Sequence, residues 1–158
     1  MKTPENTRRR LLQLAGLFGL GAVAAQARGH HTETHFEDES AHKLVYQCNK
    51  SDVEYIDHIL FSVGEMVRAY GDDIEIIVAT FGPGLRLLGT RPGGGIKPMQ
   101  QSRVKSLAEY GVKFHACGNT MKSLDWTEAD LLEFAHVVPI GVDDLMQLQE
   151  RGFSYISW

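Results

Sequence analysis

The segment Phe114-His115-Ala116-Cys117-Gly118-Asn119-Thr120 joins a short apolar run to a helical pattern. The run from Val112 to Cys117 is typical of a buried strand, and Gly118-Asn119 interrupts it before a helix that starts near Thr120. Cys117 is therefore predicted at the carboxyl end of a strand. In open α/β sheets, ligands bind outside these strand ends.

Cys117 has two interpretations at this position. Backbone N–H groups at the start of a helix stabilise negative charge, so the cysteine can have a lowered pKa and act as a nucleophile. A small buried residue at a strand end explains the same pattern, because free cysteine is among the most buried residue types. His115 would share the face of Cys117 in a strand, either as a base for the thiol or as a packed core residue.

The rest of the chain alternates strands and helices. The apolar run from Ile74 to Phe81 is typical of a parallel strand that is covered by helices on both faces. Ser51 and Glu54 predict a capping box at the start of the first helix. The predicted fold class is a three-layer α/β/α domain with a mostly parallel five-stranded sheet. The predicted strands are 44–48, 74–81, 112–117, 136–138 and 153–156, and the main helices are 52–70, 100–110 and 142–151.

A parallel sheet brings the carboxyl ends of its strands to one edge, so residues far apart in sequence meet there. We find no Ser/His/Asp set and no paired carboxylates with a recognisable spacing, and a thiol is the best candidate for chemistry. A disulfide between the two cysteines would need Cα atoms within about 7 Å, hence nearly adjacent strand ends. Besides the candidate catalytic Cys117, the predicted cleft residues are Cys48, Asn49, Gly82, Gly118, Asn119 and Pro139.

Composition limits the function classes. The chain has 158 residues, which suits one domain, and 43% of them are hydrophobic, enough for a core. Two cysteines are too few for a disulfide scaffold or a Cys-only zinc site. The net charge of −4 argues against nucleic acid as a partner. The residues predict no cofactor and no defined metal site.

Residues 1–27 have the pattern of a secretory signal peptide. Arg8-Arg9-Arg10 precedes the apolar run Leu14–Ala25, and Ala25-Gln26-Ala27 is a small-x-small cleavage signal. Paired arginines before such a run resemble the twin-arginine export signal. A membrane anchor is the alternative, but the run is shorter than the ~20 residues that a spanning helix needs. We expect a periplasmic protein without stable membrane insertion after cleavage. Loss of four basic residues and one acidic residue lowers the net charge to −7.

Residues 28–42 are rich in histidine and acidic side chains and lack apolar periodicity. This composition predicts a flexible polar arm. Loose binding of a transition metal is the alternative, although the spacing matches no defined site. The histidines are His30, His31, His35 and His42.

Three segments resemble the DsrE/DsrF-like family of sulfur-relay proteins: Phe114–Met121, Val137–Val142 and Leu148–Ile156. The resemblance covers Lys43–Trp158. It implies a flavodoxin-like fold and homo- or hetero-oligomers, often trimers or hexamers. It also implies that Cys117 carries sulfur as a persulfide.

Two hypotheses for function follow. The first is a periplasmic sulfur carrier, similar to a sulfurtransferase, that holds a persulfide on Cys117 and has a sulfur donor or acceptor protein as a partner. The second is a non-catalytic oligomeric ligand-binding module in which the cysteine is structural. Both assume a signal peptide (1–27), an arm (28–42) and a DsrE/DsrF-like domain (43–158).

Overall fold

The computed structural model describes residues 40–91 and 93–158. The predicted signal peptide and residues 28–39 of the predicted arm lie outside this part of the chain. The elements, in which η denotes a 3-10 helix, are β1 (His42–Cys48), α1 (Val53–Tyr70), η1 (Gly71–Asp73), β2 (Ile74–Thr80), η2 (Gly82–Leu88), α2 (Pro98–Glu109), β3 (Lys113–Cys117), α3 (Gly118–Ser123), η3 (Glu128–Asp130), β4 (Ala135–Val138), α4 (Gly141–Glu150) and β5 (Ser154–Ile156).

The five strands form one sheet in the order β4-β3-β2-β1-β5. Every pairing is parallel, so the predicted fold class is confirmed and the sheet is parallel throughout. At its carboxyl edge, Cys48 pairs with Thr80 and Cys117 pairs with Val138. The edge therefore holds both cysteines, but on strands that are separated by β2.

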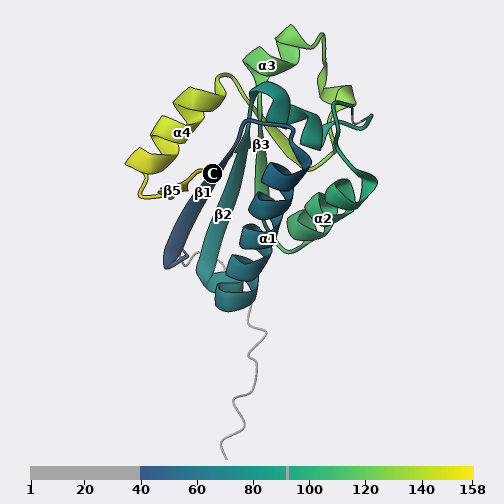
Figure 1. Ribbon diagram of the computed structural model, residues 1–158. Helices are drawn as coiled ribbons and strands as arrows, with labels where there is room; N and C mark the ends of the chain where they lie inside the picture. Colours follow the sequence, from purple (N-terminus) through teal and green to yellow (C-terminus); the bar gives the residue numbers. More distant parts are fainter. Residues whose placement is uncertain (1–39, 92) are drawn as a thin grey trace, which may run out of the picture. The chain divides into compact units, whose positions relative to one another are not determined.

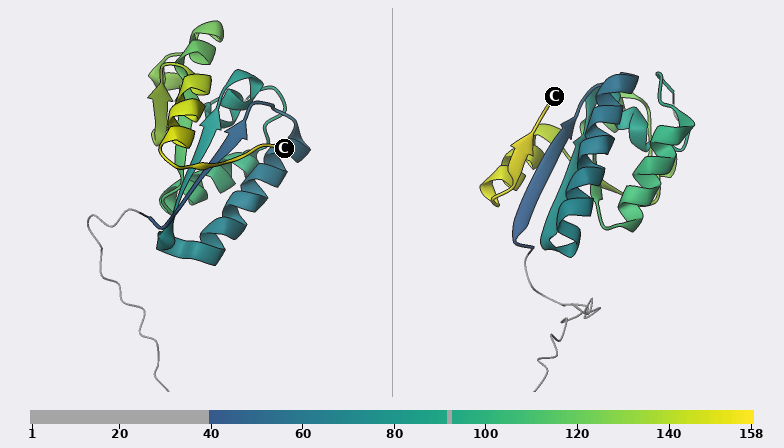
Figure 2. Two further views of the ribbon diagram at one scale, coloured as in Figure 1. Left: turned by 90° about the vertical axis from the view of Figure 1, so that its left-hand side faces the viewer. Right: turned by 60° about the horizontal axis from the view of Figure 1, so that its bottom comes forward.

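Helices cover both faces of the sheet (Figures 1 and 2). The chain steps from β1 to β4 in one direction, with α1 and α2 on one face. It then returns to β5 beside β1, and α4 crosses the opposite face. This return places the start of α4 at the carboxyl edge, directly after β4 and next to the end of β3.

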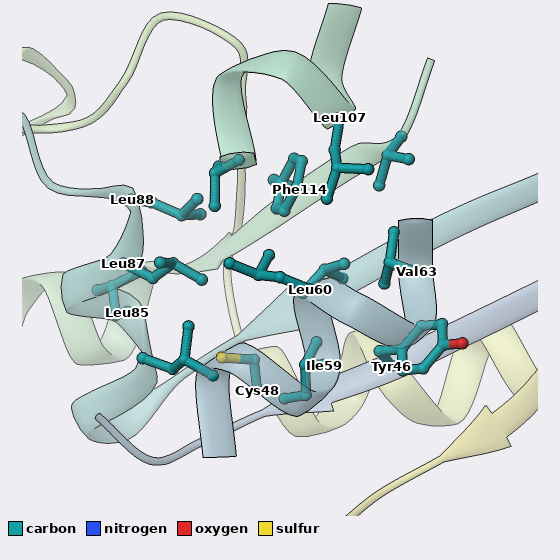
Figure 3. Packing of buried hydrophobic residues seen from close by; sticks show 14 of the residues in the cluster. Tyr46, Cys48, Ile59, Leu60, Val63, Leu85, Leu87, Leu88, Leu107 and Phe114 are labelled. Atoms are coloured by element: carbon teal, nitrogen blue, oxygen red, sulfur yellow. The ribbon is translucent and has the colours of Figure 1, made fainter. Parts of the chain in front are cut away.

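Two apolar clusters fill the layers. The larger one joins α1, α2 and η2 to the sheet, and Figure 3 shows Cys48 within it, near Ile59 and Leu85. The smaller one packs Leu145 and Leu148 of α4 against the other face. Alternate residues of β1 therefore serve different clusters, as the two-residue period of a strand requires.

The predicted start of α1 differs from the structure. Asp52, not Ser51, precedes α1, so Glu54 is its second residue and the predicted capping box does not form. The sequence also predicts a short helix that Thr127 caps with its side chain. The structure has a 3-10 helix of three residues there, with Thr127 as its N-cap and a capping box between Thr127 and Asp130.

Helix α1 has 18 residues. Neither it nor any other helix in the described ranges, 40–91 and 93–158, is long and apolar enough to cross a membrane.

Candidate functional site

Cys117 is the last residue of β3 and lies immediately before α3. Its backbone is extended, with φ −71° and ψ 115°, which is the conformation of a residue that precedes the first turn of a helix. The residue is only 5% exposed. The predicted transition from strand to helix is thus observed, although the helix begins at Gly118, two residues earlier than expected.

A second helix starts against the same sulfur. The N–H of Gly141, the first residue of α4, donates a hydrogen bond to Cys117 Sγ at 3.2 Å. A Cβ at Gly141 would lie 3.1 Å from the Cβ atoms of both Cys117 and Phe81. Glycine therefore permits the close approach that this hydrogen bond needs.

Thr120 connects the sulfur to the turn after β2. Gly82, with φ +53°, donates its N–H to Thr120 Oγ1 at 3.0 Å. Because this oxygen accepts from Gly82, its own hydrogen is available for the sulfur of Cys117. The Thr120 hydroxyl is one of the groups that stabilise the Cys117 thiolate.

These donors lower the pKa of Cys117. Burial raises the pKa, but hydrogen bonds from the Thr120 hydroxyl and from the backbone N–H groups of Thr120, Gly141 and Asn119 outweigh it. The Asn119 N–H also donates to the carbonyl oxygen of Pro139 at 3.2 Å, so it is shared. The result is a thiol with more thiolate character than an ordinary cysteine, as a nucleophile requires.

Cys48 has the opposite environment. It is fully buried in the larger apolar cluster, and burial raises the pKa of its thiol to about 12. Because β2 lies between β1 and β3, the two cysteines are separated by two strand spacings, about 9–10 Å. Both thiols are free, and a disulfide between them would need the strands to move.

The other predicted cleft residues divide into two groups. Asn49 is turned away from Cys117: its side-chain oxygen and its N–H both bond to the hydroxyl of Tyr55. Gly118 is tightly packed, since a Cβ there would lie 3.2 Å from the carbonyl oxygen of Val138. Asn119 and Pro139 are both exposed. The Asn119 N–H lies at the sulfur and also bonds to the carbonyl oxygen of Pro139.

His115 has a carboxylate partner. Its Nδ1 lies 2.7 Å from Oδ2 of Asp144, and both side chains are about 10% exposed. The ring of the exposed His136 lies 5.2 Å away, centroid to centroid. Asp144 belongs to the first turn of α4, so His115 fastens this turn to β3. This contact favours a packing role for His115 over that of a base.

Two residues of the thiolate environment were not identified as site residues from the sequence. Thr120 is the third residue of α3, and Gly141 opens a helix directly after a strand. A residue three places after a cysteine that precedes a helix is the signal that points to Thr120. Only the strand order brings Gly141 to the sulfur, and one sequence does not reveal that order.

No metal site accompanies the thiol in the described ranges. Residues 40–91 and 93–158 hold no group of three or more His, Cys, Asp or Glu side chains placed to share a metal ion.

Comparison with known families assigns the domain. The sequence pattern of the DsrE/DsrF-like family matches residues 42–158. The chain belongs to the DsrE/DsrF-like family. The match spans every strand and helix of the sheet, including the strand that ends at Cys117. The family resemblance seen in the sequence is thereby confirmed.

Solved structures share the fold at low sequence identity. MTH1491 of Methanobacterium thermoautotrophicum, described as of unknown function, has 24% identity and a TM-score of 0.67, over 74% of this chain and 99% of its own. The ychN protein of E. coli has 13% identity and a TM-score of 0.62, with the same coverage. BT1422 of Bacteroides thetaiotaomicron, also of unknown function, has 16% identity and a TM-score of 0.56, over 77% of this chain and 100% of its own. No curated protein matches the chain.

Proposed function

We propose that this DsrE/DsrF-like protein carries sulfane sulfur as a persulfide on Cys117. The observation that carries the proposal is the set of donors around one sulfur atom: the Gly141 N–H at 3.2 Å, the Thr120 hydroxyl and two N–H groups at the start of α3. These groups stabilise negative charge on sulfur. The thiolate is the nucleophilic form of a cysteine, so these groups favour its attack on a sulfur donor.

The chemistry is an exchange at sulfur. The Cys117 thiolate attacks the outer sulfur of a donor persulfide, and a new S–S bond forms as the S–S bond of the donor breaks. The electron pair leaves with the donor thiolate. Attack by an acceptor thiolate on the outer sulfur of the Cys117 persulfide passes the sulfur on and restores the thiolate. Neither transfer needs an external oxidant or reductant.

We also propose that the protein acts in the periplasm, because its first 27 residues have the pattern of a twin-arginine export signal. We propose a homo-oligomer, a trimer or a hexamer, and a donor or acceptor protein as partners. Exposed apolar side chains beside the site support an interface there: Ile140, Val142 and Met146 are 48%, 63% and 50% exposed.

Intact-mass spectrometry tests the sulfur-carrier proposal. The mature protein is incubated with polysulfide or thiosulfate beside its Cys117→Ser and Cys48→Ser variants. We expect a gain of about 32 Da per sulfur, reversible by a reductant, in the wild type and in Cys48→Ser but not in Cys117→Ser. An adduct that persists in Cys117→Ser, or none in the wild type, contradicts the proposal.

The second candidate is a ligand-binding module with an inert Cys117. The observation in its favour is that Cys117 is only 5% exposed. Reactivity separates the two candidates. A thiol that reacts with iodoacetamide as slowly as Cys48 supports the binding module, and a fast reaction with a midpoint below the usual thiol pKa supports the carrier.

A further inference from the structure

A cavity of about 380 Å³ lies next to the thiolate, between the turn after β2 and helix α3. Its lining includes Asn119 and Thr120, two of the three residues whose backbone N–H groups stabilise the sulfur of Cys117. Gly82 and Pro83 form the opposite wall. The lining of the cavity therefore includes two residues that contact the sulfur, although Cys117 itself does not line it.

The cavity has one charged residue in its lining, Arg86 of η2, and the remaining lining is neutral. The side chain of Arg86 makes no hydrogen bond or ion pair within residues 40–91 and 93–158. Its aliphatic stem passes close to Gly94, since a Cβ at Gly94 would lie 2.7 Å from Arg86 Cδ. The guanidinium thus has no counter-charge among the described residues.

The cavity presents the side-chain amide of Asn119. The Ser123 hydroxyl donates to the carbonyl oxygen of Asn119, and the Thr120 hydroxyl is directed to the sulfur of Cys117. Lys50, the basic residue next to Asn49 at the same sheet edge, lies instead over the ring of Tyr55, at 4.8 Å. Arginine with a side-chain amide donor is a side-chain set that binds oxyanions in proteins.

We propose that this cavity binds the oxyanion end of a small anionic sulfur donor, of the thiosulfate class, with Arg86 as its cationic contact. The inference rests on the proposed function of Cys117 and names its substrate class. Attack of a thiolate on a dianion is opposed by charge repulsion. A guanidinium reduces this repulsion and selects anionic donors over neutral ones.

The transfer step balances without a further reactant. The Cys117 thiolate attacks the outer sulfur of thiosulfate, a Cys–S–S bond forms and the sulfur–sulfur bond of thiosulfate breaks. The electron pair leaves with sulfite, so one persulfide anion and one sulfite dianion replace the thiolate and the thiosulfate dianion. Arg86 stabilises the negative charge on the departing sulfite.

The test compares an anionic and a neutral reagent of nearly equal size. Rates of Cys117 alkylation by iodoacetate and by iodoacetamide are measured by peptide mass mapping in the wild type, Arg86→Gln, Arg86→Lys and Arg91→Gln. Arg91→Gln is a matched control, since Arg91 is 88% exposed and pairs with Asp130 outside the cavity. The rate of sulfur uptake from thiosulfate is measured in the same four proteins.

We expect the ratio of the iodoacetate rate to the iodoacetamide rate to fall about 3- to 10-fold in Arg86→Gln. It should be retained in Arg91→Gln and largely retained in Arg86→Lys, and thiosulfate uptake should follow the ratio. An unchanged ratio in Arg86→Gln overturns the anion subsite, even where Cys117 still takes up sulfur. A lowered ratio without any sulfur uptake in the wild type supports the subsite and contradicts the sulfur-carrier function instead.

Discussion

Cys48 and Cys117 are the same residue at the same place in two strands of one sheet, yet their environments are opposite. Each is the last residue of its strand. Cys48 points into the larger apolar cluster below α1, where burial raises the pKa of its thiol to about 12. Cys117 points to the other face, where two helices begin.

The difference shows that burial alone does not decide the reactivity of a thiol. Cys117 is 5% exposed and Cys48 is 0% exposed, but Cys48 lies within the larger apolar cluster whereas Cys117 lies outside both clusters. Burial raises the pKa of both thiols, and only at Cys117 do donated hydrogen bonds reverse this shift. The pKa of each thiol therefore depends both on the depth of its burial and on the N–H and O–H groups around its sulfur.

Alkylation should show the largest contrast. At pH 7 the thiolate fraction of Cys48, with a pKa of about 12, is far below that of a thiol at the usual value of 9.0 or lower. We expect iodoacetamide to modify Cys117 at least about 1,000-fold faster than Cys48 in the folded protein. Quantitative peptide mapping between pH 5 and 9 measures both rates. Equal rates, or a Cys117 midpoint above the usual thiol pKa, would contradict the assigned difference between the two thiols.

Gly141→Ala should make Cys117 more like Cys48. The added methyl group meets Cys117 and Phe81 at 3.1 Å, so α4 must move and its N–H leaves the sulfur. We expect a raised pKa of Cys117 and a loss of about 1–3 kcal/mol in the free energy of unfolding. Urea unfolding and the pH profile of alkylation measure the two effects.

Gly64→Ala is the matched control for this substitution. In α1 the new methyl group meets only Arg68 Nη2, at 4.0 Å, and alanine favours the helix by roughly 1 kcal/mol. Gly64→Ala should therefore retain or increase stability without changing the reactivity of Cys117. A Gly141→Ala protein that behaves in the same way would show that the close approach of α4 is unimportant.

Alkaline pH should affect the two thiols with opposite sign. Cys48 ionises in the unfolded chain near 9.0 but only at about 12 when folded. Its contribution thus lowers the free energy of unfolding by about 1 kcal/mol as the pH rises to 10. The folded pKa of Cys117 is lowered, so its contribution appears as pH rises through that pKa and is fully present above the usual thiol pKa.

Unfolding in urea at pH 7 and pH 10 separates these contributions. Between the two pH values, Cys48→Ala should lose less stability than the wild type, and Cys117→Ser should lose more. The tyrosines that ionise in the same range are present in all three proteins, so their contribution cancels. The same change in all three proteins would contradict the assigned pKa directions.

Thr120→Val should have the smallest effect, because it removes one donor of several. Loss of the hydroxyl raises the pKa of Cys117, and the Gly82 N–H loses its acceptor, which costs about 1 kcal/mol. Thr120→Ser keeps the hydroxyl and should keep the wild-type pH profile of alkylation. A Thr120→Val profile identical to that of Thr120→Ser would show that the hydroxyl does not stabilise the Cys117 thiolate.

The sequence was sufficient to predict the fold class and the position of Cys117. The apolar run of β2 and the break at Gly118 carry strong local signals, since a buried parallel strand has few polar residues and a turn needs a flexible one. The sequence did not decide whether Cys48 and Cys117 are neighbours. That depends on β2 lying between their strands, which is a property of the sheet order.

The groups that tune the sulfur were harder to predict for the same reason. Gly141 and Thr120 act on Cys117 through a backbone N–H and through a hydroxyl held by Gly82. Every residue except proline has a backbone N–H, so the residue type does not show which N–H contacts the sulfur. The tertiary return of α4 brings it to the sulfur, and local periodicity contains no information about this return.

The hydrogen bond from Gly141 to Cys117 also makes a backbone amide a reporter of sulfur chemistry. The strength of an N–H···S contact follows the charge of the acceptor, so the chemical shift and the solvent-exchange rate of this one proton depend on whether the sulfur is neutral or ionised. Because the same proton belongs to the first turn of α4, we expect a change in the charge of the sulfur to change the opening equilibrium of that turn. Nuclear magnetic resonance of a single glycine thus reads the state of the thiol without a label on sulfur.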